Sequence, residues 1–493
     1  MTRINTNVES LIARRALGIN NATLNQALSR LSTGLRINSG KDDPAGLIAS
    51  ETLRSNMRAI STAIDNAVRA DTIVSVAEGG LQEISALLLD LESLVDQSAN
   101  EAGLTDAEVK ANQSQIDSIL QSINRIADSA AFGDVKLLNG NFEFTTSGIN
   151  IDTGTGTAVD HLDRVQINAA KIPNGATRQV TVNVVQASQF AYVSAVGTGG
   201  AAGTGAAVSA TTLQVTGNYG SDLLSFASGT TAQDVVTAIN SSSQLTGVSA
   251  VLSGAGTAGS PYAIIFSSTT FGSDAFVSVD VLDNPATLSL ASGEQQDYGE
   301  DGVVTINGAN AIVQGLDASV RSGGLSLDLT LSRAFGSVDG GTSTFDILGG
   351  GAVFSISPTV GLAGLESIGI GEITAAQLGN NAVGFLASLG SGLANDLSTG
   401  NFVTAQRIVR SAIDEVASLR GRLGSFQKDT VQTTINALRV AFENVTAAES
   451  AIRDADFAVE TSNLTRAQIL VNSSTTVLQI ANATPQNALA LLG

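Results

Sequence analysis

The residues of this chain that could do chemistry are few, and their spacing suits none of the common catalytic or metal sites. His161 is the single histidine and cysteine is absent, so no mechanism can use two imidazoles or a thiolate. A zinc protease motif places two histidines four residues apart on one helix, which this sequence does not offer. We therefore expect no catalytic residue, no metal site and no cofactor.

Several polar clusters imitate functional motifs without matching them. Gly34 to Lys41 resembles a phosphate-binding loop, but five residues instead of four separate the glycines, and Asp42 stands where Ser or Thr should bind magnesium. Two acidic pairs lack the frame of a calcium loop, and we interpret them as caps or loop residues: Asp42-Asp43 and Glu300-Asp301. Arg453 and Asp456 have the spacing of an ion pair on one helix face.

Composition narrows the class further. Hydrophobic residues make up 43% of the 493 residues but aromatic ones only 4%, so the core must be aliphatic. The formal net charge is −20, and residues 141–400 hold 20 Asp and Glu against 5 Lys and Arg. Such a region repels nucleic acid and anionic membranes. No uninterrupted apolar run reaches the length of a bilayer, and Met1 to Asn20 lacks the apolar stretch of a secretory signal. We expect no nucleic-acid partner and no membrane insertion, and any export would use a route without a cleaved signal peptide.

The elements that would carry any function are helices at both ends, because 39 of the 51 glycines lie between residues 141 and 400 and proline is absent from residues 45–172 and 359–484. Near the N-terminus one helix stripe steps by three and four residues: Leu24, Leu28, Leu31 and Leu35. We expect this helix to end near Gly34. Asp43 and Pro44 then start a helix to about residue 99, and another follows from Asp106 to Ala131.

The C-terminal flank mirrors this pattern. A stripe through Leu419, Leu423 and Phe426 is followed by a phase slip and resumes at Ile435. We expect a break between Val459 and Leu464 and a last helix from Leu464 to Ala483. Stripes of this length need a partner helix. The sequence therefore predicts a mixed α and β fold, with long antiparallel coiled-coil helices from both termini.

The middle region alternates apolar and polar residues, as β-strands do. Leu325 to Leu331, Val277 to Val281 and Val180 to Val184 follow this period, and a short helix is expected from Thr231 to Asn240. We expect a β-rich insertion of one or more small domains, whose strand pairing the sequence leaves open.

Both flanks carry distinctive motifs. The N-terminal ones are Arg30-Leu31-Ser32-Thr33-Gly34-Leu35-Arg36-Ile37-Asn38-Ser39 and Lys41-Asp42-Asp43-Pro44-Ala45-Gly46. The C-terminal ones are Ile452-Arg453-Asp454-Ala455-Asp456-Phe457-Ala458, Leu464-Thr465-Arg466, Gln468-Ile469-Leu470 and Pro485-Gln486. With these motifs the chain resembles bacterial flagellin over roughly residues 1–140 and 405–493. Leu213 to Ala250 is also similar to a small insert of that family.

The resemblance implies a structural, non-enzymatic subunit that polymerises into the extracellular flagellar filament for motility. Residues 1–43 and 460–493 would form an inner coiled-coil domain that lines a channel, 44–175 and 402–459 a helical wall domain with a β-hairpin, and 176–401 the variable outer domains. Inner-coil assembly would rest on Leu24, Leu28, Leu31, Leu35, Leu464, Val471 and Leu478. Wall assembly would rest on Met57, Ile60, Ile64, Leu81, Ile84, Leu88, Phe442, Ile452, Arg453 and Asp456.

The same resemblance implies partners. They are further copies of the chain, hook-associated and cap proteins, the flagellar type III export apparatus and an export chaperone that binds the C-terminus. A receptor-facing helix would include Leu88, Asp90, Ser93 and Leu94, but the Arg and Glu of many family members are Asp90 and Ser93 here, which predicts weak recognition by a toll-like receptor. A hook–filament junction protein, which shares flagellin-like termini, is the alternative function.

Overall fold

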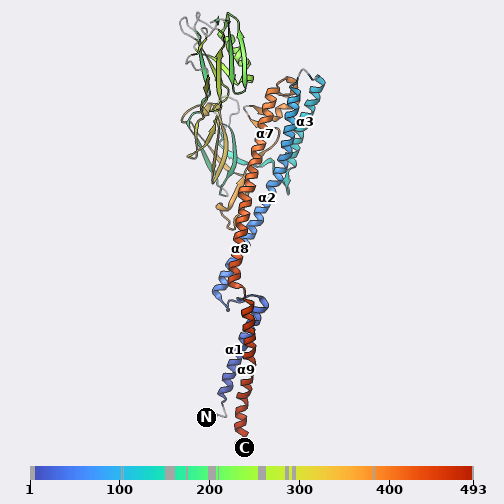
Figure 1. The fold of residues 1–493 in the computed structure, drawn as a ribbon, viewed down its shortest axis with the longest axis vertical. Helices are drawn as coiled ribbons and strands as arrows, with labels where there is room; N and C mark the ends of the chain where they lie inside the picture. The colour runs from blue at the N-terminus through green and yellow to red at the C-terminus, as the bar shows by residue number, and fades with distance from the viewer. Residues whose placement is uncertain are drawn as a thin grey trace. The chain divides into compact units, whose positions relative to one another are not determined.

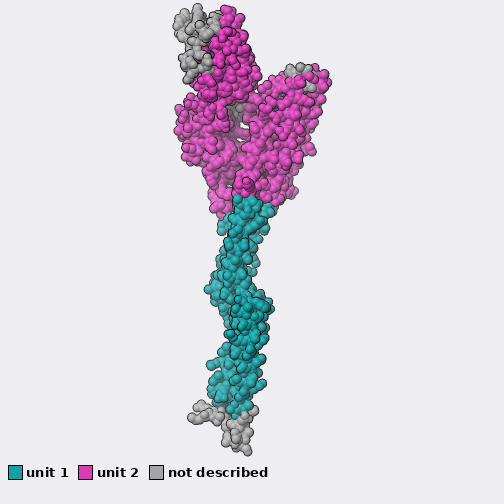
Figure 2. Space-filling model, viewed as in Figure 1, with its two compact units in different colours: residues 1–69, 355–360, 431–493 teal, residues 70–354, 361–430 magenta. Residues whose placement is uncertain are grey.

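The computed structural model describes residues 6–100, 103, 105–149, 161–173, 176–197, 207–208, 210–253, 262–283, 288–290, 296–380 and 383–490. The chain divides into two compact units (Figure 2). Unit 1 comprises residues 1–69, 355–360 and 431–493, and unit 2 comprises residues 70–354 and 361–430. Each unit is described by itself below.

Unit 1 is helical. It contains α1 (Val8–Thr33), the first part of α2 (Pro44–Ser98), α8 (Thr433–Arg453) and α9 (Phe457–Ala490). α1 and α9 pack side by side (Figure 1). In a second contact, Ile60 and Ala63 of α2 are buried against Leu438 of α8.

The helix ends in the N-terminal flank confirm the sequence prediction. α1 begins after Asn7, whose Oδ1 accepts a hydrogen bond from the Ser10 N–H at 3.0 Å, and ends at Gly34 with φ of 73°. α2 begins at Pro44, and Asp43 Oδ1 accepts a bond from the Gly46 N–H at 2.9 Å. A carboxylate cap followed by proline is well suited to a helix start.

Two expectations for the C-terminal flank are wrong. The break lies at residues 454–456 rather than between Val459 and Leu464, because Asp456 Oδ1 accepts bonds from the N–H groups of Ala458 and Val459 at 2.8 and 3.1 Å and so starts α9. α9 also continues past Ala483 to Ala490, through Pro485.

The helical part of unit 2 consists of the rest of α2, α3 (Asp106–Ser129) and α7 (Phe402–Ser425). The predicted α2 stripe is the centre of its core, with these residues at most 1% exposed: Val74, Ala77, Leu81, Ile84, Leu88, Leu91 and Val95. By length and composition α2 also contains a window apolar enough to cross a membrane. Of that window, 28% is buried.

The predicted phase slip is a local change of helix type. A π-helical segment, Phe426–Gln432, connects α7 to α8. Since each π-turn takes more residues than an α-turn, the apolar stripe shifts its phase there.

Short strands lie beside the helices of unit 2. They are β1 (Ala131–Phe132), β2 (Val135–Lys136), β3 (Asn139–Phe142), β24 (Leu365–Ile368), β25 (Ile370–Glu372), β26 (Gly379–Asn380) and β27 (Gly384–Phe385). β1 and β2 form the expected hairpin, and β25 pairs with β3.

The middle region forms two β-modules, both in unit 2. The first contains β4 (Phe144–Ser147), β5 (Leu162–Ala170), β6 (Arg178–Gln186), β17 (Val303–Ile306), β18 (Ala309–Asn310), β19 (Ile312–Gln314), β20 (Asp317–Ser322), β21 (Leu325–Leu331) and β22 (Thr342–Gly350). Its two antiparallel sheets have the orders β18-β17-β6-β22-β4 and β19-β20-β21-β5, and they share one aliphatic core.

The second module is inserted between β6 and β17. It contains β7 (Tyr192–Gly197), β9 (Thr211–Gly217), β10 (Gly220–Phe226), α4 (Ala232–Ser241), α5 (Ser243–Thr246), β12 (Val248–Ser253), β13 (Tyr262–Ser268), β14 (Phe276–Val281), β15 (Leu288–Leu290) and β16 (Gln296–Tyr298). Its sheets have the orders β10-β9-β14-β16 and β12-β13-β7-β15. The strands and the helix predicted by alternation are confirmed, and so is the mixed fold class.

Candidate assembly surfaces

The pairing of α1 with α9 is antiparallel and polar along its length. Asn7 Nδ2 donates to the Ala481 carbonyl at 2.7 Å, and Asn20 Nδ2 donates to Ser474 Oγ at 2.6 Å. Farther along, the Arg30 guanidinium is 3.1 Å from a carboxylate oxygen of Glu460, whose side chain is 8% exposed. As the residue number rises on α1 it falls on α9, so the two helices run in opposite directions.

The buried apolar residues of this helix pair are small. In the described part of unit 1, the buried apolar residues of α1 and α9 are all alanines: Ala13, Ala27, Ala467 and Ala481. The large apolar residues are therefore left half-buried or exposed. Within one chain, the pairing of α1 with α9 therefore leaves their large apolar side chains partly or largely exposed.

A second, exposed apolar face lies on each helix, and the sequence reading missed it. On α1, Val8, Ile12 and Ile19 are separated by four and seven residues, so they share one side, with 52%, 54% and 61% of each exposed. On α9, Val459, Leu470 and Val477 share a side by steps of eleven and seven. The sequence carries a signal for this face on α1, because Val8, Ile12 and Ile19 form an apolar stripe on a different side of the helix from Leu24 and Leu31.

The predicted inner-coil residues lie mostly at the edge of the helix pair. Half-buried are Leu24, Leu31, Leu35, Leu464, Val471 and Leu478, whereas Leu28 is 45% exposed. Leu24 and Leu31 lie on the same side of α1 as the buried Ala27, at three and four residues from it. They face the partner helix of the same chain, and the exposed residues face away from it.

The predicted wall residues are divided between the units. In unit 1, Ile60 is buried, and Met57, Ile64, Phe442 and Ile452 are half-buried. In unit 2, Leu81, Ile84 and Leu88 are fully buried in the core. Of the receptor-facing residues, Leu88 therefore lies in the core, Leu94 is half-buried, and Asp90 and Ser93 are exposed.

The two breaks in the flanks, at residues 34–43 and 454–456, are paired with one another. The Arg36 N–H donates to the Arg453 carbonyl at 2.7 Å, and the Ala455 N–H donates to the Gly34 carbonyl at 2.9 Å. The expected ion pair between Arg453 and Asp456 is wrong, because Asp456 is taken up by the cap of α9. Arg453 instead lies 3.0 Å from Glu51 of α2. We call this set of contacts the joint of unit 1.

Hydrogen bonds stabilise the ionised carboxylates of the joint. The Ser39 hydroxyl donates to Asp42 Oδ2 at 2.9 Å and, with the N–H groups of Ser39 and Asn38, holds the pKa of Asp42 below its usual value. The hydrogen bond from Arg54 lowers the pKa of Glu51, and Arg453 adds to the effect. Both carboxylates are therefore charged acceptors at neutral pH, and for Asp42 this agrees with the predicted cap or loop role.

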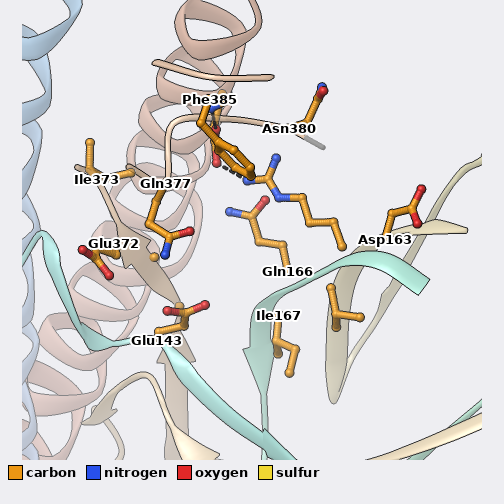
Figure 3. A pocket seen from close by; sticks show the side chains of 15 residues that line it. Glu143, Asp163, Gln166, Ile167, Glu372, Ile373, Gln377, Asn380 and Phe385 are labelled. Carbon is orange, nitrogen blue, oxygen red and sulfur yellow. Dashed lines mark hydrogen bonds and ion pairs between the residues drawn. The ribbon is translucent and has the colours of Figure 1, made fainter. Parts of the chain in front are cut away.

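A pocket of about 300 Å³ opens in unit 2 beside Glu143, Glu372 and Phe385 (Figure 3). Burial and the charge of Glu372 raise the pKa of Glu143. Another of its carboxylates, Glu415, forms an ion pair with Arg164. The described residues that line this pocket include four carboxylates, of Glu143, Asp163, Glu372 and Glu415, and no serine, threonine, lysine or histidine.

The described residues thus form paired helical ends with exposed apolar faces, and β-modules lie between these ends in the chain. Three family models match the chain: the bacterial flagellin N-terminal helical region at residues 4–143, the bacterial flagellin C-terminal helical region at residues 407–492, and the flagellin hook IN motif at residues 212–270. The last of these covers the insert that the sequence suggested.

Whole-length relatives agree. The chain is 31% identical to a flagellin of Salmonella rubislaw and 28% identical to a B-type flagellin of Pseudomonas aeruginosa, in each case over 99% of both chains. A solved hook-associated protein from Legionella pneumophila is 11% identical and matches 85% of this chain and 99% of its own, with a TM-score of 0.25. The chain belongs to the bacterial flagellin family, and it is a structural subunit of the flagellar filament.

Proposed function

We propose that the outward apolar faces of α1 and α9 are the surfaces through which one subunit contacts the next in the filament. The observation that carries this proposal is the exposure of large apolar residues on both helices of a pair whose buried apolar residues are alanines. On α1 these are Val8, Leu11, Ile12 and Ile19, and on α9 they are Val459, Ile469, Leu470, Val477 and Ile480. Burying one such side chain fully is worth about 1.5–3 kcal/mol, so a row of them favours association.

The remaining assignments concern the inner coiled coil, the wall and the outer part of the subunit. Residues 1–43 and 457–493 act as the inner coiled coil, because α9 begins at Phe457 rather than at the predicted residue 460. The wall takes residues 44–142 and 352–453, because Ile370, Leu378 and Leu389 belong to the core of α2, α3 and α7. The outer part takes residues 144–350, because β4 and β5 pair with β22 and β21 rather than with the wall. The inner helices are held together by Leu24, Leu28, Leu31, Leu35, Leu464, Val471 and Leu478. The predicted wall residues hold the helices of the wall together in the same way. Their support is the half-burial of most of the first set and the burial of Ile60, Leu81, Ile84 and Leu88.

Seeded polymerisation of the purified chain, viewed by electron microscopy, tests the assembly surface. Val477→Asp places a charge on the outward face, and Gln479→Asp places the same charge at an exposed position on the other side of α9 from Val477. We expect Val477→Asp to abolish elongation and Gln479→Asp to retain most of it. Equal elongation by both variants would show that the outward face is not the contact. A chain lacking Met1 to Arg36 should form no filaments.

Other partners belong to the same proposal. The subunit leaves the cell through the flagellar export apparatus, meets an export chaperone with its C-terminal helix, and abuts hook-associated and cap proteins at the ends of an extracellular filament. The support is the family membership and the exposed apolar face of α9, which must be covered before assembly. The chain acts without catalysis, and the exposed Asp90 and Ser93 make recognition by the immune receptor weak.

A further inference from the structure

The apolar contacts between α1 and α9 bury little area. The apolar residues buried there are Ala13, Ala27, Ala467 and Ala481. A shift of α9 by one turn would bring Asn463 or Val471 to the place of Ala467, so these contacts oppose a shift, but each buries only a methyl group. Polar contacts that only one alignment satisfies add to this preference for one register.

The carbonyl of Ala481 lacks the usual hydrogen-bond donor of a helical carbonyl. In an α-helix this carbonyl would accept a bond from the N–H four residues later, but that residue is Pro485, which has no N–H. Asn7 Nδ2 takes the vacant place and donates to the Ala481 carbonyl at 2.7 Å. The helix therefore continues past the proline with its carbonyl satisfied by the other helix.

Asn7 is fixed where it makes this contact. Its Oδ1 caps α1 through the Ser10 N–H at 3.0 Å, so both ends of the amide are in use. The next turn adds Ser10 Oγ, which donates to Asn482 Oδ1 at 2.7 Å. A shift of α9 by one turn would remove both contacts and leave the Ala481 carbonyl, on a residue only 6% exposed, without a donor.

Two more polar contacts between α1 and α9 fit the same alignment of the helices. Asn20 donates to Ser474 Oγ at 2.6 Å, and Arg30 pairs with the buried Glu460 at 3.1 Å. A buried carboxylate that loses its cation is strongly unfavourable, so this end also resists a shift. We call the contacts Asn7–Ala481, Ser10–Asn482, Asn20–Ser474 and Arg30–Glu460 the polar ladder.

We propose that the polar ladder sets the register of α1 against α9, with the carbonyl freed by Pro485 as its key position. This inference rests on the proposed function, because the register decides how the outward faces of the two helices are offset. Asn7 and Pro485 are thus positioning residues for filament assembly. They act by aligning Ile19 and Val477 and their neighbours, rather than by contacting the next subunit.

A double-mutant cycle in seeded polymerisation tests the key contact. Asn7→Asp keeps the oxygen that caps α1 but loses the donor, and Pro485→Ala supplies an N–H that occupies the Ala481 carbonyl. Each should raise the critical concentration about fivefold, and the double variant should match either single one instead of reaching about 25-fold. Pro485→Ala raises the helix propensity of α9, so its weaker assembly would not follow from helix stability. Asn21→Asp, the same change at an exposed position of α1, should leave assembly unchanged.

The register itself can be read by cross-linking, since the chain has no cysteine of its own. Ser10→Cys with Asn482→Cys reports the native alignment, and Ser10→Cys with Thr475→Cys reports a shift of two turns. In the parent chain under assembling conditions the first pair should oxidise faster. Asn7→Asp should reduce that preference several-fold. An unchanged preference, or multiplied effects in the double variant, would overturn the proposal. Absence of filaments from the parent chain would instead contradict the proposed function.

Discussion

Asp301 joins the two β-modules, at the point where the chain leaves the inserted module. Its Oδ1 accepts bonds from the N–H groups of Gly315 and Ser273 at 2.7 and 3.1 Å, and its Oδ2 accepts one from the Ser273 hydroxyl. Gly272 approaches so closely that an added Cβ would lie 2.4 Å from Asp301 Oδ1. One acidic residue of a pair predicted to have a cap or loop role therefore connects three loops.

The ionisation of Asp301 predicts an acid-sensitive connection. Burial alone would raise the pKa of Asp301, but the hydrogen bonds from Gly315 and Ser273 outweigh it and hold the pKa below its usual value. A depressed folded-state pKa stabilises the fold above the unfolded value, and this stability is lost as pH falls through the folded value. We expect the thermal midpoint of the parent chain to fall more steeply below about pH 4 than that of Asp301→Asn.

Differential scanning calorimetry of both chains between pH 7 and pH 2.5 measures this difference. Asp283→Asn, at an exposed carboxylate of the inserted module, is the control and should follow the parent. Parallel curves for the parent and Asp301→Asn would show that the ionised carboxylate does not hold the loops.

At the scale of elements, the flanks could be predicted from the sequence and the middle could not. A single period identified the α2 stripe, and caps at Asp43 and Gly34 fixed two helix ends. Each signal is local to a few turns of one helix. The pairing of β6 with β17 joins residues more than one hundred positions apart, and alternation alone does not say which strand is the neighbour.

The assembly surface was only partly predictable for a similar reason. Leu24 and Leu31 on α1 belong to an apolar stripe, and so do Val8, Ile12 and Ile19, but periodicity cannot say which stripe faces the partner helix of the same chain. The position of α9 decides which stripe of α1 is covered within the chain. A lone helix has no donor for the carbonyl that Pro485 leaves free, which favours a helix end near Ala483, whereas Asn7 of α1 supplies a donor and α9 continues.

Two adjacent glycines of α2 make a matched test of its packing. At Gly80 an added Cβ would lie 2.9 Å from Leu138 Cδ1 and 3.3 Å from Ala130 Cβ, and Leu138 is fully buried. At Gly79 no described atom outside the helix's own turn lies within 4 Å. Alanine is favoured over glycine in a helix by about 0.5–1 kcal/mol.

We expect Gly79→Ala to raise the free energy of unfolding by about 0.5–1 kcal/mol, and Gly80→Ala to lose that gain to crowding. Gly80→Val should lower the free energy of unfolding by about 1–3 kcal/mol, since overpacking forces the strand loop containing Leu138 to move. Urea denaturation followed by circular dichroism measures all three. Stabilisation by Gly80→Ala equal to that of Gly79→Ala would mean that α2 does not pack closely there.

At the scale of the whole molecule, assembly brings together chains that each carry a formal charge of −20. Residues 144–350, the outer part of the proposed organisation, hold 16 Asp and Glu against 5 Lys and Arg, so more than half of that charge lies there. Repulsion between such regions opposes association and is screened by salt, with a screening length of about 10 Å at 0.1 M. Salt also weakens ion pairs, but Glu460 of the Arg30 pair is 8% exposed and is therefore screened less.

The long-range repulsion should therefore decide the salt dependence. We expect the critical concentration for seeded elongation to fall several-fold as sodium chloride rises from about 10 to about 150 mM. Sucrose at the same osmolality, which does not screen charge, should change it much less. The Arg30→Glu and Glu460→Arg double reversal keeps the net charge, so it should retain the same salt slope. A critical concentration that rises with salt would mean that attraction between charged groups, and not apolar contact, holds the subunits together.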